Sequence, residues 1–153
     1  MKDDKENILK WFDLFENNAI HVATRSNNPK LLKELIELVP KEERWKALCQ
    51  KNCEGNTILH EVVFCKEVQM ADVVFEIEDE LLLQSEAKGS LLEIRNKRGE
   101  TPLFIAAMHG KLKMLEHLAN RVVRVSGDVK EHFHRSDKCS ALHASVIGQH
   151  FGN

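Results

Sequence analysis

The chain has 153 residues and a mass of 17.6 kDa, which suits one domain or one short repeat array. Hydrophobic residues make up 42% of it, which argues against disorder, and the absence of Tyr and the few glycines favour helices over sheet. The 22 basic and 24 acidic residues are well mixed and give a formal charge of −2, so no basic stripe suggests nucleic-acid binding.

We expect no secretion signal in the N-terminal residues. The first fifteen, MKDDKENILKWFDLF, lack the apolar core of a signal peptide. No apolar run approaches the ~20 residues that a membrane-spanning helix needs; the longest are Val62–Cys65, Val73–Phe75 and Leu81–Leu83. We therefore expect a cytoplasmic chain that does not insert into a membrane by itself. In that compartment the four cysteines are poor evidence for disulfides, and Cys65, at helical spacing among apolar residues, is expected to be buried.

A four-residue signature recurs along the chain. Its copies read Asn18-Ala19-Ile20-His21, Thr57-Ile58-Leu59-His60, Thr101-Pro102-Leu103-Phe104 and Ser140-Ala141-Leu142-His143. Aligned on the fourth residue, successive copies lie 39, 44 and 39 residues apart, and small or apolar residues follow each one. Self-similarity at such a period is typical of a stacked repeat array. This architecture favours a binding surface over an active site.

The first two copies each predict a pair of helices. In the first copy the turn Asn27-Asn28-Pro29 separates a short helix from a second one that ends before Pro40. In the second copy the turn Asn52–Asn56 leads to Thr57 as N-cap of the first helix. The expected apolar positions are Ile20, Ala23, Leu32, Leu35 and Ile36 in the first copy, and Leu59, Val62, Val63, Ala71, Val74 and Phe75 in the second.

The third copy is the clearest. The turn 96–100 precedes Thr101 as N-cap, and Pro102 follows at the first helical position, where its missing N–H costs nothing. Gly110 is expected to end this helix. A second helix is predicted to bury Leu112, Leu115, Leu118 and Ala119. The fourth copy has only a first helix, with Leu142, Ser145 and Val146, before Asn153.

These copies resemble the ankyrin repeat, whose pattern is a turn glycine, Thr-Pro-Leu-His, two alanines, a glycine and a second helix with Val and Leu-Leu. The match is strong at 96–119, good at 52–75 and weaker at 13–36 and 135–149. The resemblance implies an all-α ankyrin-repeat solenoid in one domain, with repeats at about 13–51, 52–95, 96–134 and, incomplete, 135–153. It assigns a structural role to Thr57, His60, Gly99, Thr101, Pro102, Gly110 and His143, the histidine rings tying one turn to the next through backbone groups.

The chain departs from this pattern at a few positions. Phe104 replaces the histidine, Lys66 replaces the glycine between the helices, and Lys138 replaces a turn glycine. Glu61-Val62-Val63 is also bulkier than the usual small residues. We expect looser geometry at these places without loss of the fold.

The repeats are longer than the ~33 residues of an ordinary ankyrin repeat. The extra residues, Val39–Lys51, Glu80–Ile94 and Arg121–His134, are expected to extend the hairpins, lengthen the second helices or be mobile. The phrases AIHVATRSNNPKLLKELIELVP, LLEIRNKRGETPLFIAAMHGKL and RSDKCSALHASVIGQHFGN resemble plant ankyrin proteins of the accelerated-cell-death type, which carry a C-terminal membrane domain with a Pro-Gly-Gly motif. The resemblance implies signalling or defence at the plasma membrane, and it leads us to expect a fragment or truncated product that covers only the ankyrin repeats.

Catalytic and metal sites have weaker support. Glycines occur singly, never as a phosphate-binding loop, so we expect no enzyme. His132, His134, Cys139 and His143 have the ligand types of a zinc site, as do Cys49, Cys53 and His60. No CxxC pair occurs, and His60 and His143 already have repeat roles, so no metal or cofactor is expected; a metal- or redox-linked role stays an alternative. The acidic cluster Asp72, Glu76, Glu78, Asp79 and Glu80 is expected to be a solvated helix face.

Partner binding is the function that the pattern favours. In ankyrin arrays the turn tips and the outer positions of the first helices face the partner. The best candidates at these positions are Glu61, Phe64, Lys97, Arg98, Glu100, Ile105 and Met108; others are Leu14, Glu16, Cys53, Glu54, Asn56, Ser136, Asp137, Cys139, Ala144 and Ile147. An alternative is that Phe64 and Ile105 only fill gaps between irregular repeats. We expect a monomeric, non-catalytic module that binds proteins, with a fragment lacking independent activity as the rival interpretation.

Overall fold

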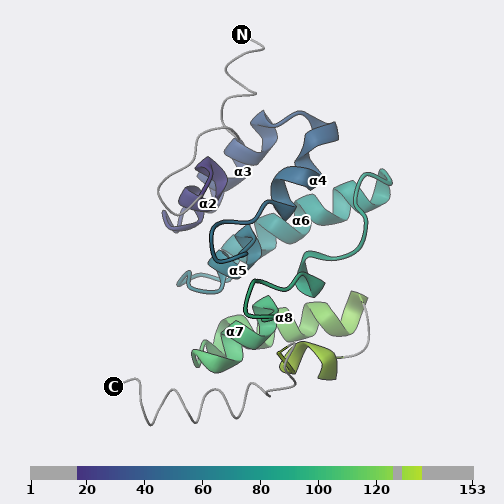
Figure 1. Cartoon of the computed structure of the whole chain (residues 1–153). Helices are drawn as coiled ribbons and strands as arrows, with labels where there is room; N and C mark the ends of the chain where they lie inside the picture. The colour runs from purple at the N-terminus through teal and green to yellow at the C-terminus, as the bar shows by residue number, and fades with distance from the viewer. Residues whose placement is uncertain (1–16, 126–128, 136–153) are drawn as a thin grey trace.

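The computed structural model describes residues 17–125 and 129–135, and every regular element in this part of the chain is a helix. The helices form stacked pairs, each with a short first helix and a longer second one (Figure 1). The pairs are α2 (Ala19–Thr24) with α3 (Pro29–Leu38), α5 (Ile58–Val62) with α6 (Gln69–Leu83), and α7 (Pro102–Met108) with α8 (Leu112–Val125). The predicted all-α stack of helix pairs is therefore confirmed.

Each pair packs on the next. In the row of first helices α5 contacts both α2 and α7, and in the row of second helices α3 contacts α6. The core runs through the stack without a break, from Ile20 in α2 to Val122 in α8. The fourth signature copy, including His143, lies outside the described residues, as do Leu14, Glu16 and Cys139.

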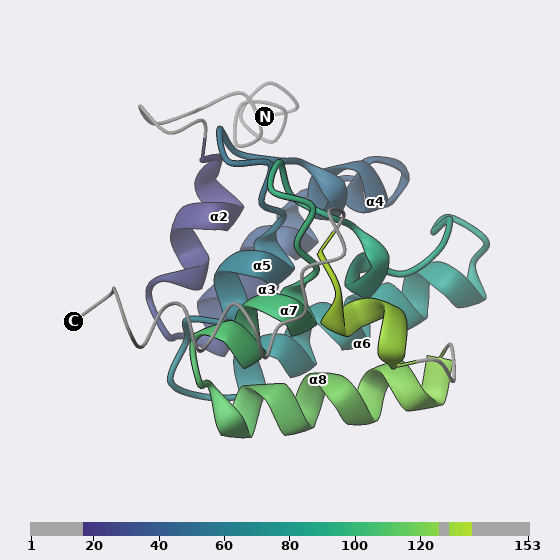
Figure 2. The ribbon, with the colours of Figure 1, turned by 60° about the horizontal axis from the view of Figure 1, so that its bottom comes forward.

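The long segments between repeats add helix rather than extended hairpins. The first forms a separate helix, α4 (Lys41–Cys49). In the other two, α6 and α8 continue into the extra residues, and the one-turn helices η1 (Leu91–Glu93) and η2 (Lys130–Phe133) follow them. Figure 2 shows η2 beside α7, which it contacts. No helix of the described part is long and apolar enough to cross a membrane.

Short-range signals set the ends of the helices, and those of α7 are as predicted. The Asn28 side chain accepts a hydrogen bond from Leu31 N at 3.1 Å and so caps α3, and Pro29 follows in the first turn. Thr101 caps α7 in the same way, through Phe104 N at 3.1 Å. At the other end of α7, Gly110 has φ +64°, a conformation that L side chains rarely adopt.

The buried stripe of α8 differs from the predicted one. Leu112 is 73% exposed, whereas Met114, Leu118, Arg121 and Val122 are buried. Leu115 and Ala119 pack against the core only at its edge. The prediction placed Leu112 on the buried face, but it is the first residue of the helix, where the chain is still leaving the turn at Gly110.

The expectation that the acidic cluster forms a solvated face is wrong for one member. Asp72, Glu76, Asp79 and Glu80 are exposed, but the Glu78 side chain has no exposed surface. One Glu78 oxygen accepts Leu91 N at 2.7 Å, and the other accepts Nη2 of Arg121 at 3.0 Å. Arg121 also pairs with Asp79 and lies over the Phe75 ring, 4.8 Å from its centroid. Glu78 therefore joins α6 to both η1 and α8.

Where Lys66 replaces the glycine of the pattern, the second repeat has a longer connection. α5 ends at Val62 and α6 begins at Gln69, whereas α7 ends at Met108 and α8 begins at Leu112. Cys65 is buried there, as predicted, and its thiol donates to the carbonyl of Thr24 at 3.0 Å.

Candidate functional site

Two turns of the same design precede the first helices of the second and third repeats. In the turn 52–56, Asn52 N donates to Asn56 O at 3.0 Å, and in the turn 96–100, Asn96 N donates to Glu100 O at 3.0 Å. The turn glycines, Gly55 and Gly99, have φ +77° and +76°. This left-handed conformation is why the turn needs glycine.

The two turns are stacked and bonded to one another. Lys97 N donates to the carbonyl of Glu54 at 3.0 Å, so the backbones touch. The side-chain amide of Asn96 donates to Oδ1 of Asn56 at 2.9 Å, and the amide of Asn52 donates to Oδ1 of Asn17 at 2.9 Å. This amide ladder was not predicted, although an Asn three residues before the glycine in both turns was visible in the sequence.

A buried histidine joins the same two repeats from behind the turns. His60 Nδ1 accepts the backbone N–H of Thr57 at 3.1 Å, and its Nε2 donates to the carbonyl of Glu100 at 3.0 Å. His21 makes the equivalent contact with the turn 52–56, with its Nε2 3.1 Å from the carbonyl oxygen of Asn56. Burial holds the pKa of His60 at about 4, below its usual 6.5, so the ring is neutral and holds one proton for this bond.

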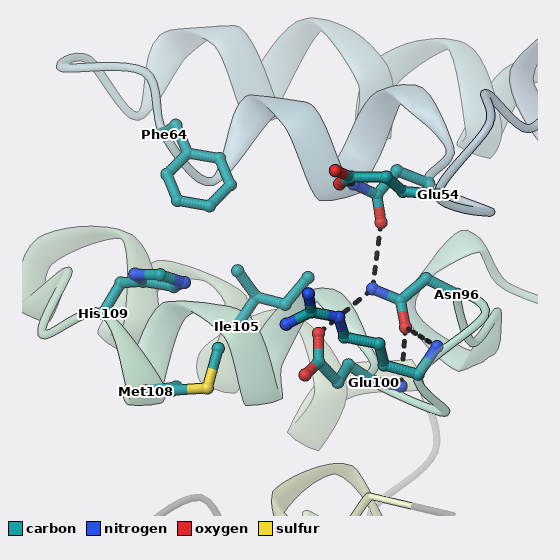
Figure 3. A pocket seen from close by; sticks show the side chains of 9 residues that line it. Glu54, Phe64, Asn96, Glu100, Ile105, Met108 and His109 are labelled. Carbon is teal, nitrogen blue, oxygen red and sulfur yellow. Dashed lines mark hydrogen bonds between the residues drawn. The ribbon is translucent and has the colours of Figure 1, made fainter. Parts of the chain in front are cut away.

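A half-open pocket of about 240 Å³ lies at the junction of the second and third repeats. It faces the turns and the first helices, and residues of both repeats line it (Figure 3). The lining residues are Glu54, Asn56, Phe64, Asn96, Arg98, Glu100, Ile105, Met108 and His109.

The pocket has an apolar side and a polar side. On the apolar side Phe64, 47% exposed, meets His109 edge to face with ring centroids 5.1 Å apart, and Ile105 and Met108 lie beside them (Figure 3). On the polar side are the amides of the ladder, two carboxylates and the Arg98 guanidinium. The combination suits a ligand that is itself part apolar and part polar.

The structure brings together five of the seven predicted partner residues: Phe64, Arg98, Glu100, Ile105 and Met108. The other two lie outside the pocket. Glu61 accepts the side-chain amides of Asn52 and Asn56, at 2.9 and 3.3 Å, and Lys97 is exposed at the turn tip. Ile105 is only 3% exposed and also belongs to the core, so packing accounts for its apolar character.

Two lining residues, Asn96 and His109, were not among the predicted ones. Asn96 had been taken only as part of a turn, yet its side chain reaches across to the previous repeat. His109 follows Met108, which the 44-residue spacing places opposite Phe64. The same spacing relates Asn96 to Asn52, so the repeat period was the sequence signal that could have identified both residues.

The described residues give no support to the alternative of a metal- or redox-linked role. No three His, Cys, Asp or Glu side chains among them lie together as metal ligands would, so Cys49, Cys53 and His60 form no such group. The other predicted set consists of His132, His134, Cys139 and His143. Of these, Cys139 and His143 fall outside the described residues. Burial raises the pKa of the Cys49 and Cys65 thiols to about 11, which keeps both protonated rather than nucleophilic.

Comparison with known families agrees with this geometry. A family model described as the ankyrin repeat matches residues 98–125. The matched span begins in the turn at Arg98, includes α7 and ends with α8, so it covers the third helix pair and part of the pocket. The chain thus contains an ankyrin repeat within an all-α ankyrin-type solenoid.

Proposed function

We propose that the chain is a non-catalytic protein-interaction module, a scaffold or regulator, that uses the pocket between its second and third repeats to hold its partner. Ankyrin repeats typically bind proteins and have no catalytic role of their own. The observation that carries the proposal is the pocket itself, in which exposed Phe64 and half-buried Met108 stand beside polar groups. Aromatic and methionine side chains ringed by polar groups are typical of the residues that contribute most to binding.

The stacking of the repeats supports binding to a preformed surface. The turns carry hydrogen bonds within each repeat and between repeats, so the residues that they present are already ordered. Binding of a partner then requires little loss of conformational entropy at this face. The resemblance to the plant membrane-linked ankyrin proteins supports a role in signalling or defence, with full-length relatives at the plasma membrane.

A retention experiment tests the proposal. The chain is immobilised and exposed to cytosolic and membrane fractions of plant cells, beside two double variants. The pocket variant carries Phe64→Ala and Met108→Ala; the control carries Leu83→Ala and Leu112→Ala, which truncate apolar residues that are 88% and 73% exposed elsewhere.

A protein retained by the wild type and the control but lost from the pocket variant would support the proposal. Equal retention by all three chains would remove the pocket as the interface. No selective retention by any folded chain would contradict the interaction role in these cells.

A further inference from the structure

The carboxylate of Glu100 is the least satisfied group in the pocket. Glu100 is only 3% exposed, and its Oε2 accepts the amide of Asn96 at 3.1 Å. Its other oxygen, Oε1, is buried and has no hydrogen-bond partner in the part of the chain that the structure describes. A buried carboxylate oxygen without a donor is costly, and in a native protein such an atom calls for an explanation.

The corresponding positions of the earlier repeats show no such deficit. Asn17 and Asn56 occupy them, and the Oδ1 of each accepts the side-chain amide of an asparagine in the following turn, at 2.9 Å. A carboxylate replaces the amide only at Glu100, within the three described repeats, and it does so on the wall of the pocket. Within the described residues the Glu100 carboxylate therefore has one donor, Asn96, to offset its charge on the wall of the pocket.

Charge and shape restrict what that donor can be. Glu54 and Glu100 face one cation, Arg98, so the lining has a net negative charge. Phe64, Ile105 and Met108 supply an apolar wall beside the carboxylates. Arginine and lysine side chains combine an apolar stem with a cationic tip that can only donate hydrogen bonds.

The volume points to one side chain rather than a small organic ligand. The pocket holds about 240 Å³, below the roughly 300–1,000 Å³ typical of cofactor and drug sites. We propose that this pocket receives a single basic side chain, Arg or Lys, from the protein partner, with its cationic tip held by the carboxylates of Glu54 and Glu100. The inference rests on the proposed function and names the chemistry of the partner.

Arg98, one of the predicted partner-facing residues, then opposes the binding of this side chain. It is exposed, lines the pocket and carries the same charge as the incoming side chain. It therefore repels a basic ligand and competes with it for the carboxylates. Removing its charge should strengthen binding, whereas a pocket that selects acidic ligands would lose binding by the same change.

The test is a titration of the ¹⁵N-labelled chain, followed by NMR, with three small probes. These are N-acetyl-arginine methylamide, its neutral isostere N-acetyl-citrulline methylamide, and N-acetyl-glutamate methylamide. Variants are Glu100→Gln, Arg98→Gln and, as a control, Glu116→Gln, an exposed carboxylate on α8 that does not line the pocket. The spectrum of each free variant verifies its fold.

We expect the arginine probe to shift the amides of residues 96–109 saturably and the other two probes to do so far more weakly. Loss of a charge-assisted hydrogen bond should weaken the arginine probe about tenfold in Glu100→Gln. Arg98→Gln should strengthen it about twofold, and Glu116→Gln should leave it unchanged. Equal binding of the citrulline probe, an unaffected Glu100→Gln variant, or weaker binding in Arg98→Gln would each overturn the inference.

The same variants separate this inference from the proposed function. A protein lost from the Phe64/Met108 pocket variant but retained equally by wild type and Glu100→Gln would overturn the basic-ligand inference and leave the interaction role standing. Saturable, Glu100-dependent binding of the arginine probe without any pocket-dependent protein would keep the cation site and contradict the interaction role.

Discussion

His60 Nε2 lies 3.0 Å from the backbone carbonyl of Glu100, forty positions further along the chain. The two residues thus link the scaffold to the pocket, because His60 fixes the backbone of the residue whose side chain lines it. The bond is buried on both sides, since His60 has no exposed surface and Glu100 is 3% exposed.

Replacing His60 by Gln should therefore destabilise the chain strongly. The shorter, differently shaped amide cannot satisfy both Thr57 N and Glu100 O, and each buried group left without a partner costs about 1–3 kcal/mol. Urea unfolding measures the loss. His109→Gln, at an exposed histidine whose ring meets Phe64 edge to face, should cost no more than about 1 kcal/mol. Equal effects at the two histidines would refute a structural role for the His60 ring.

Stability should depend on pH through His60. Burial holds its folded-state pKa at about 4, and in the unfolded chain the pKa returns to the usual 6.5. Between these pH values only the unfolded state binds the proton. The contribution of His60 to the free energy of unfolding is therefore fully present above pH 6.5, falls as the pH drops toward 4, and is constant below that. The shift corresponds to roughly 3 kcal/mol.

The difference between wild type and His60→Gln isolates this contribution from the other histidines. It should be largest above pH 7 and shrink as the pH falls from 6.5 to 4, in urea unfolding measured at several pH values. A difference independent of pH would show that His60 titrates alike in both states.

The buried ion pair between α6 and α8 gives a third prediction. Arg121→Met should cost about 3–5 kcal/mol, because it leaves the Glu78 carboxylate buried without its cation. Asp79→Asn should cost only about 0–1 kcal/mol, since the Asp79 side chain is half exposed. Adding Glu78→Gln to Arg121→Met should restore part of the loss by removing the stranded charge. If the double variant is less stable than Arg121→Met, burial of an unpaired charge is not the cause.

The sequence predicted the features that depend on neighbouring residues. Thr101, Pro102 and Gly110 act within one turn of chain, and their places at the ends of α7 are as predicted. Burial of Glu78 was not predictable in this way, because its partner Arg121 is 43 residues away. In a charged cluster on one helix, nothing local distinguishes the inward carboxylate from its solvated neighbours.

The pocket likewise has features that the sequence predicts and features that depend on contacts between residues far apart in the chain. The repeat pattern alone selected Phe64, Arg98, Glu100 and Met108 as facing residues, because each position on a repeat has a fixed direction. It could not give the depth of burial of Glu100, or the lack of a donor to its Oε1 among the described residues, since both depend on how closely the turns stack. The hydrogen bond from Lys97 N to Glu54 O sets the distance between the turns. It joins backbone groups, so the identity of the side chains does not reveal it.

The close approach of the two turns predicts different effects for two glycines. Gly55 and Gly110 both have positive φ, so alanine is strained at either position by about 1–2 kcal/mol. At Gly110 an added Cβ meets nothing within 4 Å, but at Gly55 it would lie 2.6 Å from Lys97 N, which is backbone and cannot swing aside.

Gly55→Ala must therefore separate the turns and break the bond from Lys97 N to Glu54 O, and it should destabilise the chain by more than Gly110→Ala in urea unfolding. Because the same movement shifts Asn96 and Arg98, Gly55→Ala should also change the amide resonances of the pocket, whereas Gly110→Ala should leave those of the turn 96–100 in place. Equal losses of stability, with an unchanged pocket spectrum in Gly55→Ala, would mean that the contact between the turns does not determine the geometry of the site.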